Sequence, residues 1–191
     1  NNYDWITDSV NVMAVEGENA IVDWVFVEIR SKNDSTDVLT ARSGLLQRDG
    51  DIVDIDGVSH LKFAGFIQDS FYVVVKHRNH LGVMSQIVSK SDLVDFTSIN
   101  YPVFDFGTSL NNGYDYEGLA TNNNALYGYR ALWGGDFNGD GKIKFTNPFD
   151  DINYLFFDVL AHINNISVNS NFDFALGYYQ GDFNLNGKVK Y

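Results

Sequence analysis

A short stretch in the C-terminal third of the chain carries the strongest chemical signal. From Asp136 the sequence reads Asp-Phe-Asn-Gly-Asp-Gly-Lys-Ile, so that oxygen-bearing side chains fall on alternate positions and a glycine follows them. Calcium takes about six to eight oxygen ligands, and this alternation turns Asp136, Asn138 and Asp140 into one concavity. Gly141 allows the sharp bend, and the carbonyl of Lys142 stands at the seventh position. The spacing therefore predicts a calcium site.

The same phrase returns at the end of the chain, over residues 181–191. The two copies match through Gly-Asp-Phe-Asn and again through Gly-Lys, an aliphatic residue, Lys and an aromatic residue, which indicates an internal repeat. The candidate ligands of the second copy are Asp182, Asn184, Asn186 and the carbonyl of Lys188. Because the amide of Asn186 stands where the first copy has the carboxylate of Asp140, we expect either weaker calcium binding or a hydrogen-bonded turn that keeps the shape without the ion.

The first copy lacks an acid at its twelfth position, where such a loop has a bidentate carboxylate. Asn147 stands there, and the next acids are Asp150 and Asp151. We expect an enlarged loop that Asp150 or Asp151 closes, followed at once by a helix over residues 150–163. Ile143 should anchor the loop to a core. The apolar residues of the predicted helix follow a spacing of three and four: Ile152, Leu155, Phe156, Val159, Leu160 and Ile163.

The two copies resemble the calcium repeats of type I dockerins, in which an EF-hand-like loop is followed by a single helix. The resemblance covers residues 132–191. It implies a small α-helical dockerin-like unit that binds Ca²⁺ and could dock a protein partner. Two features depart from the family pattern: the closing acid is displaced, and position nine is Lys144, which cannot act as a ligand.

Composition and charge narrow the class of protein. The net charge is −12, which argues against nucleic acid as a partner. Of the 25 acidic residues only four are Glu, and the Asp excess favours a loop-rich β protein with hard-cation sites. The chain has no cysteine, so disulfides and thiolate chemistry are excluded. No apolar run approaches the length of about 18 residues that a membrane span needs.

Residues 1–98 read as short strands separated by Gly, Asp and Asn turns, which predicts a mainly β domain with an Ig-like antiparallel sandwich. The first strand is expected at residues 10–15. Residues 20–30 alternate, with Val25, Val27 and Ile29 on one face. Residues 71–77 begin with a continuous run of apolar residues, 71–75, and should form a central buried strand.

Three blocks of this half, residues 23–30, 41–51 and 75–84, resemble a module found near the ends of large cell-surface or haemagglutinin-like adhesins of Bacteroidota, many of them exported by the type IX secretion system. The resemblance implies an extracellular, surface-displayed location. It implies no reaction.

Residues 99–131 form an Asn- and Gly-rich connector that carries many aromatic residues. Those side chains should pack the connector against its neighbours, or present a platform for a glycan. The acids Asp49, Asp51, Asp54 and Asp56 are expected to belong to a solvated hairpin or to hold a further cation. His77 and His80 flank Arg78, and no nucleophile or acid stands beside them at a readable spacing. We expect them to make structural hydrogen bonds.

The chain lacks the common catalytic motifs, among them HExxH, GxSxG and the P-loop. The sequence therefore predicts a non-catalytic extracellular module, rigidified by calcium, within a bacterial surface adhesin or filament. Its partners would be other domains or copies of the same surface protein. The alternatives are a dockerin-like docking module, an accessory region of a secreted hydrolase, and a carbohydrate-binding unit.

Overall fold

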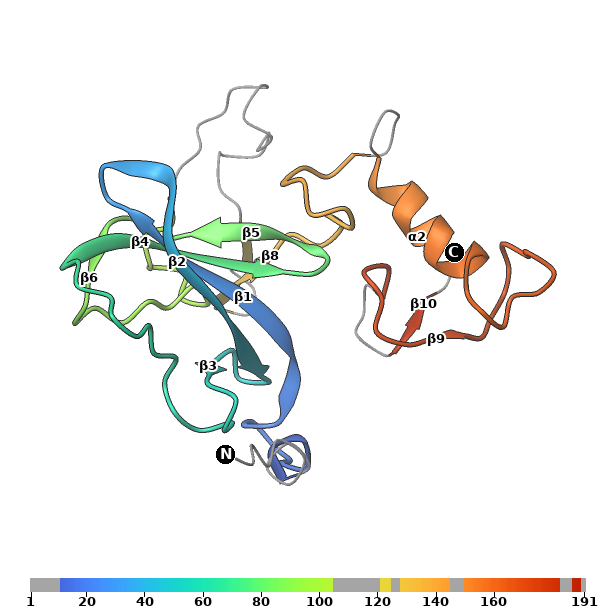
Figure 1. Ribbon diagram of the computed structural model, residues 1–191, viewed down its shortest axis with the longest axis horizontal. Helices are drawn as coiled ribbons and strands as arrows, with labels where there is room; N and C mark the ends of the chain where they lie inside the picture. The colour runs from blue at the N-terminus through green and yellow to red at the C-terminus, as the bar shows by residue number, and fades with distance from the viewer. Residues whose placement is uncertain (1–10, 105–120, 125–127, 145–149, 183–186, 190–191) are drawn as a thin grey trace.

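A computed structural model describes residues 11–104, 121–124, 128–144, 150–182 and 187–189, with the backbone alone described at 121–124. Strands dominate this part of the chain (Figure 1). The predicted mainly β class with antiparallel pairing is confirmed.

One six-stranded antiparallel sheet organises the first half. Its strands run in the order β3-β2-β1-β4-β5, and β6 pairs with β4. Their bounds are β1 Ile21–Ser31, β2 Asp34–Gln47, β3 Ile52–Val53, β4 Ser70–His77, β5 His80–Met84 and β6 Val88–Ser89. Strand β4 lies inside the sheet, as the apolar run predicts. The described strands form a single layer here, and the two-layer sandwich stays a prediction.

Alternation along β1 produces the main core. Val25, Val27 and Ile29 are buried on one face, while Trp24 and Phe26 are exposed on the other. This is the arrangement that a period of two requires of a strand with one covered face. Val25 and Val27 pack with Val75, Val83 and Val103 into one cluster.

The remaining described elements lie toward the C-terminus. Strands β7 Thr121–Asn124 and β8 Tyr129–Leu132 form one hairpin, and β9 Ala175–Leu176 pairs with β10 Lys188–Val189. Helix α2 spans Asp151–Leu160 and has its own small core, in which Val159, Ala175 and Val189 are fully buried. No described helix is long and apolar enough to cross a membrane.

The strand expected at residues 10–15 is wrong: residues 11–13 are helical. Val12 is the buried residue of this segment and packs with Leu45 and Val53. Alternation over so few residues is a weak signal, and one apolar contact with the sheet suffices to hold a helical turn.

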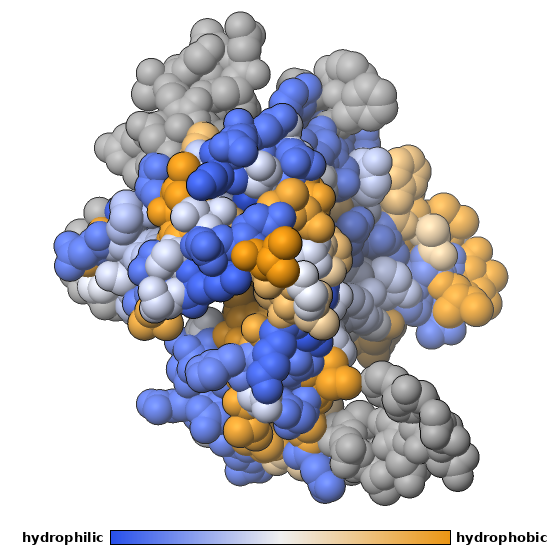
Figure 2. All heavy atoms as spheres, turned by 60° about the vertical axis from the view of Figure 1, so that its left-hand side comes forward, coloured by the Kyte–Doolittle hydropathy of each residue, from blue (hydrophilic) through white to orange (hydrophobic). Residues whose placement is uncertain are grey.

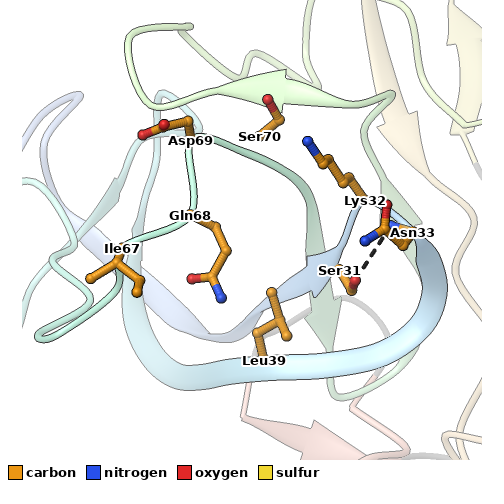
Figure 3. Close-up of a pocket in the computed structure, with 8 residues that line it drawn as sticks. All are labelled: Ser31, Lys32, Asn33, Leu39, Ile67, Gln68, Asp69 and Ser70. Carbon is orange, nitrogen blue, oxygen red and sulfur yellow. Dashed lines mark hydrogen bonds between the residues drawn. The ribbon is translucent and has the colours of Figure 1, made fainter.

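Figure 2 shows hydrophobic groups set among hydrophilic ones on the face that it displays. A hollow of about 400 Å³ lies beside the β1–β2 turn, as Figure 3 shows. Most of its lining side chains are exposed, which makes it a surface feature rather than an enclosed pocket; they are Ser31, Lys32, Asn33, Leu39, Ile67, Gln68, Asp69 and Ser70.

Candidate metal centre

Loop 1, residues 135–144, is shaped by its own acids and amide. Asp136 accepts hydrogen bonds from the backbone N–H of Asp140 at Oδ1 (3.1 Å) and of Gly141 at Oδ2 (3.0 Å). Asn138 Oδ1 accepts from the N–H of Asp140 (2.8 Å), and Asp140 Oδ1 accepts from the N–H of Lys142 (2.9 Å). Gly139 and Gly141 have φ of +71° and +79°, which glycine adopts without strain. The three predicted side-chain ligands thus hold the loop in one turn.

Asp151 ties the start of helix α2 back to loop 1. Its Oδ1 accepts the N–H of Phe137 (2.9 Å), and its Oδ2 accepts the N–H of Lys144 (2.6 Å). The carbonyl of Lys144 in turn accepts the N–H of Asp151 (3.0 Å). The displaced acid therefore closes both ends of an enlarged loop through hydrogen bonds.

Asp150 has a different part. It is the N-cap of α2, and its Oδ1 accepts the N–H of Asn153 (3.0 Å). Such a cap satisfies one of the N–H groups that the first helical turn leaves without a partner. The hydrogen bonds join Asp151 to both ends of loop 1 and make Asp150 the helix cap, and which of the two acids would bind calcium stays a prediction.

Negative charge gathers in loop 1. Asp136 is buried, and this burial raises its pKa to about 6, with Asp151 and Asp140 adding to the rise and the N–H of Gly141 opposing it. In the described part of the chain no Lys, Arg or His side chain forms an ion pair with Asp136. A bound cation would relieve this repulsion.

The donor chemistry fits a hard cation. A carboxylate offers about four lone-pair sites, so the bonds to backbone N–H groups leave each acid with capacity for an ion. Within the described ranges no three His, Cys, Asp or Glu side chains form a group that could hold a metal. The predicted set also uses the amide of Asn138 and the carbonyl of Lys142, and calcium binding by this set stays a prediction.

Loop 2, residues 181–189, repeats the central contact of loop 1. Asp182 Oδ2 accepts the N–H of Gly187 (2.8 Å), just as Asp136 Oδ2 accepts the N–H of Gly141. The predicted ligands Asn184 and Asn186 lie outside the described residues. Lys188 begins strand β10, opposite Leu176 in β9. In the described residues, the two copies of the repeat therefore share this hydrogen bond from a glycine N–H to the leading aspartate.

Helix α2 supplies a second acid that the sequence analysis missed. Asp158 Oδ2 accepts the N–H of Gly181 (2.8 Å), and burial raises the pKa of Asp158. A side chain at Gly181 would meet this oxygen at 2.9 Å and Val189 Cγ1 at 3.0 Å. Asp151 and Asp158 are seven positions apart, a two-turn helical spacing that could have drawn attention to both.

The apolar residue that follows each loop behaves differently in the two copies. Val189 is fully buried beside Val159 and Ala175. Ile143, at the matching position, is 47% exposed, so the prediction that it anchors loop 1 to a core is wrong. It lies instead over Gly135, where a Cβ would be 3.3 Å from Ile143 Cγ2.

The turn between β4 and β5 joins the sheet to loop 2. Arg78 donates to the carbonyl of Tyr179, and its Nη2 lies 3.5 Å from Asp182 Oδ2. Asn79, fully buried, donates through Nδ2 to the carbonyl of Asp182 (2.7 Å). In Figure 1 this turn points toward the C-terminal unit, the part of the chain that holds α2, β9 and β10. Nothing in the local sequence signals these contacts, because they join residues about a hundred positions apart.

A polar cluster lies under the same turn. Asp23 Oδ2 is 3.1 Å from His77 Nε2 and 3.0 Å from Arg78 Nε, and Asp23 Oδ1 accepts the hydroxyl hydrogen of Tyr178 (2.7 Å). Burial alone would raise the pKa of Asp23. The bonds from His77, Tyr178, the Trp24 N–H and Arg78 outweigh it and hold that pKa well below its usual range. The acid beside the histidines is therefore supplied from β1.

The acids of residues 49–56 serve as turn and pairing groups. Asp54 pairs with Arg42 (2.6 Å), and Asp49 accepts the N–H of Asp51 (3.1 Å). Asp56 Oδ1 accepts the N–H of Ser59 and of Val58, and the hydrogen bonds from Ser59 lower its pKa to about 2. These contacts favour the solvated hairpin over a further cation site.

Of the aromatic residues between positions 99 and 133, Tyr101, Phe104, Tyr129 and Trp133 fall within the described residues. Phe104 packs edge-on against Tyr72, with ring centroids 5.6 Å apart. The carbonyl of Trp133 accepts the N–H of Leu81 (2.8 Å), which joins the end of the connector to β5. The contact of Phe104 agrees with packing, whereas Tyr129 is 50% exposed. Phe106, Tyr114, Tyr116 and Tyr127 lie outside the described residues.

Comparison with known proteins adds no relative. The chain matches no family model, no curated protein and no solved structure.

Proposed function

We propose that the chain is a non-catalytic extracellular structural module, stiffened by Ca²⁺ at loop 1, of a bacterial cell-surface adhesin or filament. In this proposal the six-stranded sheet is one layer of the predicted Ig-like sandwich. Residues 132–191 are a dockerin-like unit. Neighbouring domains or copies of the same surface protein are the partners.

One observation carries the proposal. Asp151 is the first residue of α2 and bonds both Phe137 and Lys144 of loop 1. An ion that fixed this loop would also fix the start of the helix, and its binding energy would become folding energy. A loop and helix that become rigid only with calcium suit a module that transmits force or sets the spacing between domains outside the cell. Many extracellular domains are stiffened by disulfides, but this chain has no cysteine.

The experiment is calorimetric calcium titration with thermal melts in calcium and in EDTA. Wild type, Asp136→Ala and Asp69→Ala should be compared; Asp69 is a surface carboxylate that is 95% exposed and serves as the matched control. We expect wild type and Asp69→Ala to bind calcium and to melt several degrees higher with it. Asp136→Ala should lose both effects. Absence of heat and of any shift in wild type would refute the proposal.

A docking role is the second candidate, because the C-terminal unit exposes many large apolar side chains. They include Phe157, Ile163, Ile166, Phe174 and Leu176, with Ile166 91% exposed. Exposed apolar groups in such number are typical of protein contact surfaces. This favours a protein partner or a second copy over a glycan, and it also suits an accessory region of a secreted hydrolase.

Sedimentation across a range of concentrations tests the self-associating form of this role. Wild type should sediment faster as its concentration rises, and the double variant Ile163→Asp with Ile166→Asp should remain monomeric. A wild type that stays monomeric at all concentrations would remove self-association and leave docking to a different protein.

A further inference from the structure

Arg78, in the β4–β5 turn, contacts loop 2 and the segment just before it. Its guanidinium donates to the carbonyl of Tyr179 and lies 3.5 Å from the carboxylate of Asp182. It also pairs with Asp23 (3.0 Å) and stacks on the ring of Tyr178, 4.2 Å from the centroid. The side chains of Arg78 and Asp182 are only 11% and 2% exposed. A buried guanidinium with this many partners is held in one position, unlike an arginine in an exposed ion pair.

Asn79, the next residue of the turn, bonds to both loops. Its Nδ2 donates to the carbonyl of Asp182 (2.7 Å), while its own carbonyl accepts the N–H of Gly135 at the start of loop 1 (2.8 Å). One turn of the sheet thus contacts the first residue of one repeat and the leading acid of the other.

The leading acids of the two loops differ in whether a positively charged side chain faces them. Asp136 leads loop 1 and has no ion-pair partner among the described Lys, Arg and His side chains. Asp182 leads loop 2 and faces Arg78. A calcium ion on Asp182 would stand beside this guanidinium, and like charges in a buried place repel strongly. The described contacts of Asp182 therefore favour a guanidinium over a calcium ion at this carboxylate.

We propose that Arg78 is the resident cation of loop 2. The second repeat, in this view, is an anchor that clamps the C-terminal unit to the β4–β5 turn rather than a second calcium site. The chain would bind a single calcium ion, at loop 1. The clamp itself would need no calcium, so it holds or fails independently of the proposed function.

Native mass spectrometry of the calcium-loaded chain counts the ions directly. We expect one ion in wild type, one in Asp182→Asn and none in Asp136→Asn. Two ions in wild type, with one lost in Asp182→Asn, would overturn the proposal. No ion in any of the three would refute calcium at loop 1, and the clamp would then be judged by its stability in EDTA.

Melts in EDTA provide that second measurement. Arg78→Met removes the guanidinium, and Arg48→Met removes an equal charge from an exposed side chain elsewhere. We expect Arg78→Met to lower the melting temperature by about 5 °C and Arg48→Met to leave it unchanged. Equal melts of the two variants would overturn the clamp. Should Arg78→Met not fold, Arg78→Lys keeps the charge without the planar fork and should still melt below wild type; an unchanged melt would also overturn it.

Discussion

The hydroxyl of Tyr178 donates a 2.7 Å hydrogen bond to Asp23 Oδ1. This bond links the C-terminal unit to the third residue of strand β1. The tyrosine ring is largely exposed, but its hydroxyl ends on a carboxylate that is 1% exposed. Burial of this end and the charge of Asp23 raise the pKa of Tyr178 to about 12. The pair belongs to the same joint as Arg78.

Removal of this hydroxyl should loosen the joint. Tyr178→Phe leaves Asp23 with one donor fewer, and we expect a loss of about 1 kcal/mol in the free energy of unfolding. Urea unfolding measures it, and Tyr154→Phe, at an exposed position on α2, is the control and should be neutral. Equal stability of the two variants would mean that the hydroxyl contributes nothing.

Substitution of the two acids at the start of α2, Asp150 and Asp151, should affect calcium binding differently. Asp150→Ala removes the helix cap and should cost about 1 kcal/mol, with and without the ion. Asp151→Ala removes the bonds to Phe137 and Lys144, and should weaken calcium binding at least about tenfold. Calorimetry and melts of both variants make the comparison. The reverse assignment would follow if Asp150→Ala lost the ion and Asp151→Ala kept it.

Gly181 should tolerate no side chain. A Cβ there would lie 2.9 Å from Asp158 Oδ2 and 3.2 Å from the Leu155 Cα, which belongs to the helix backbone and cannot turn away. We expect Gly181→Ala to destabilise the protein by about 1–3 kcal/mol. Gly82→Ala is the control, since its nearest neighbour is the flexible side chain of Lys76 at 3.2 Å. Thermal melts that shift equally for both would contradict this packing.

His80 should make stability depend on pH. Burial, with the charges of His77 and Arg78, lowers the pKa of His80 from 6.5 to about 4, because the folded state favours the neutral ring. The unfolded chain then binds more protons between these values. Stability is therefore fully present above about pH 6.5 and is lost as the pH falls toward about 4. The loss should be about 2 kcal/mol after allowance for the partly exposed ring.

Unfolding by urea at a series of pH values tests this dependence. Other groups titrate in the same range, and Asp136, whose pKa is raised, acts in the opposite direction. The informative quantity is therefore the difference between wild type and His80→Gln. That difference should shrink below pH 6.5, whereas His60→Gln, at an exposed histidine, should follow wild type throughout. A difference that does not vary with pH would rule His80 out as the source.

Local sequence determined the parts of this protein whose contacts are short in range. The Asp-x-Asn-x-Asp-Gly spacing of loop 1 bonds its own backbone within a few positions, so the turn can be read from residues 136–142. Alternation in β1 and the helical spacing before Val159 likewise place each side chain by a period of the backbone. The mainly β class follows from the same signals.

Tertiary structure alone decided how these parts meet. Asp158 bonds Gly181, Arg78 meets Asp182, and Tyr178 reaches Asp23. The exposure of Ile143 against the burial of Val189, at equivalent repeat positions, was settled in the same way. No local period encodes such pairs, because a partner far along the chain is selected by packing of the whole fold. The sequence by itself therefore determined two loops of like sequence, and the fold decided that Arg78 of the β4–β5 turn lies against the leading acid of the second.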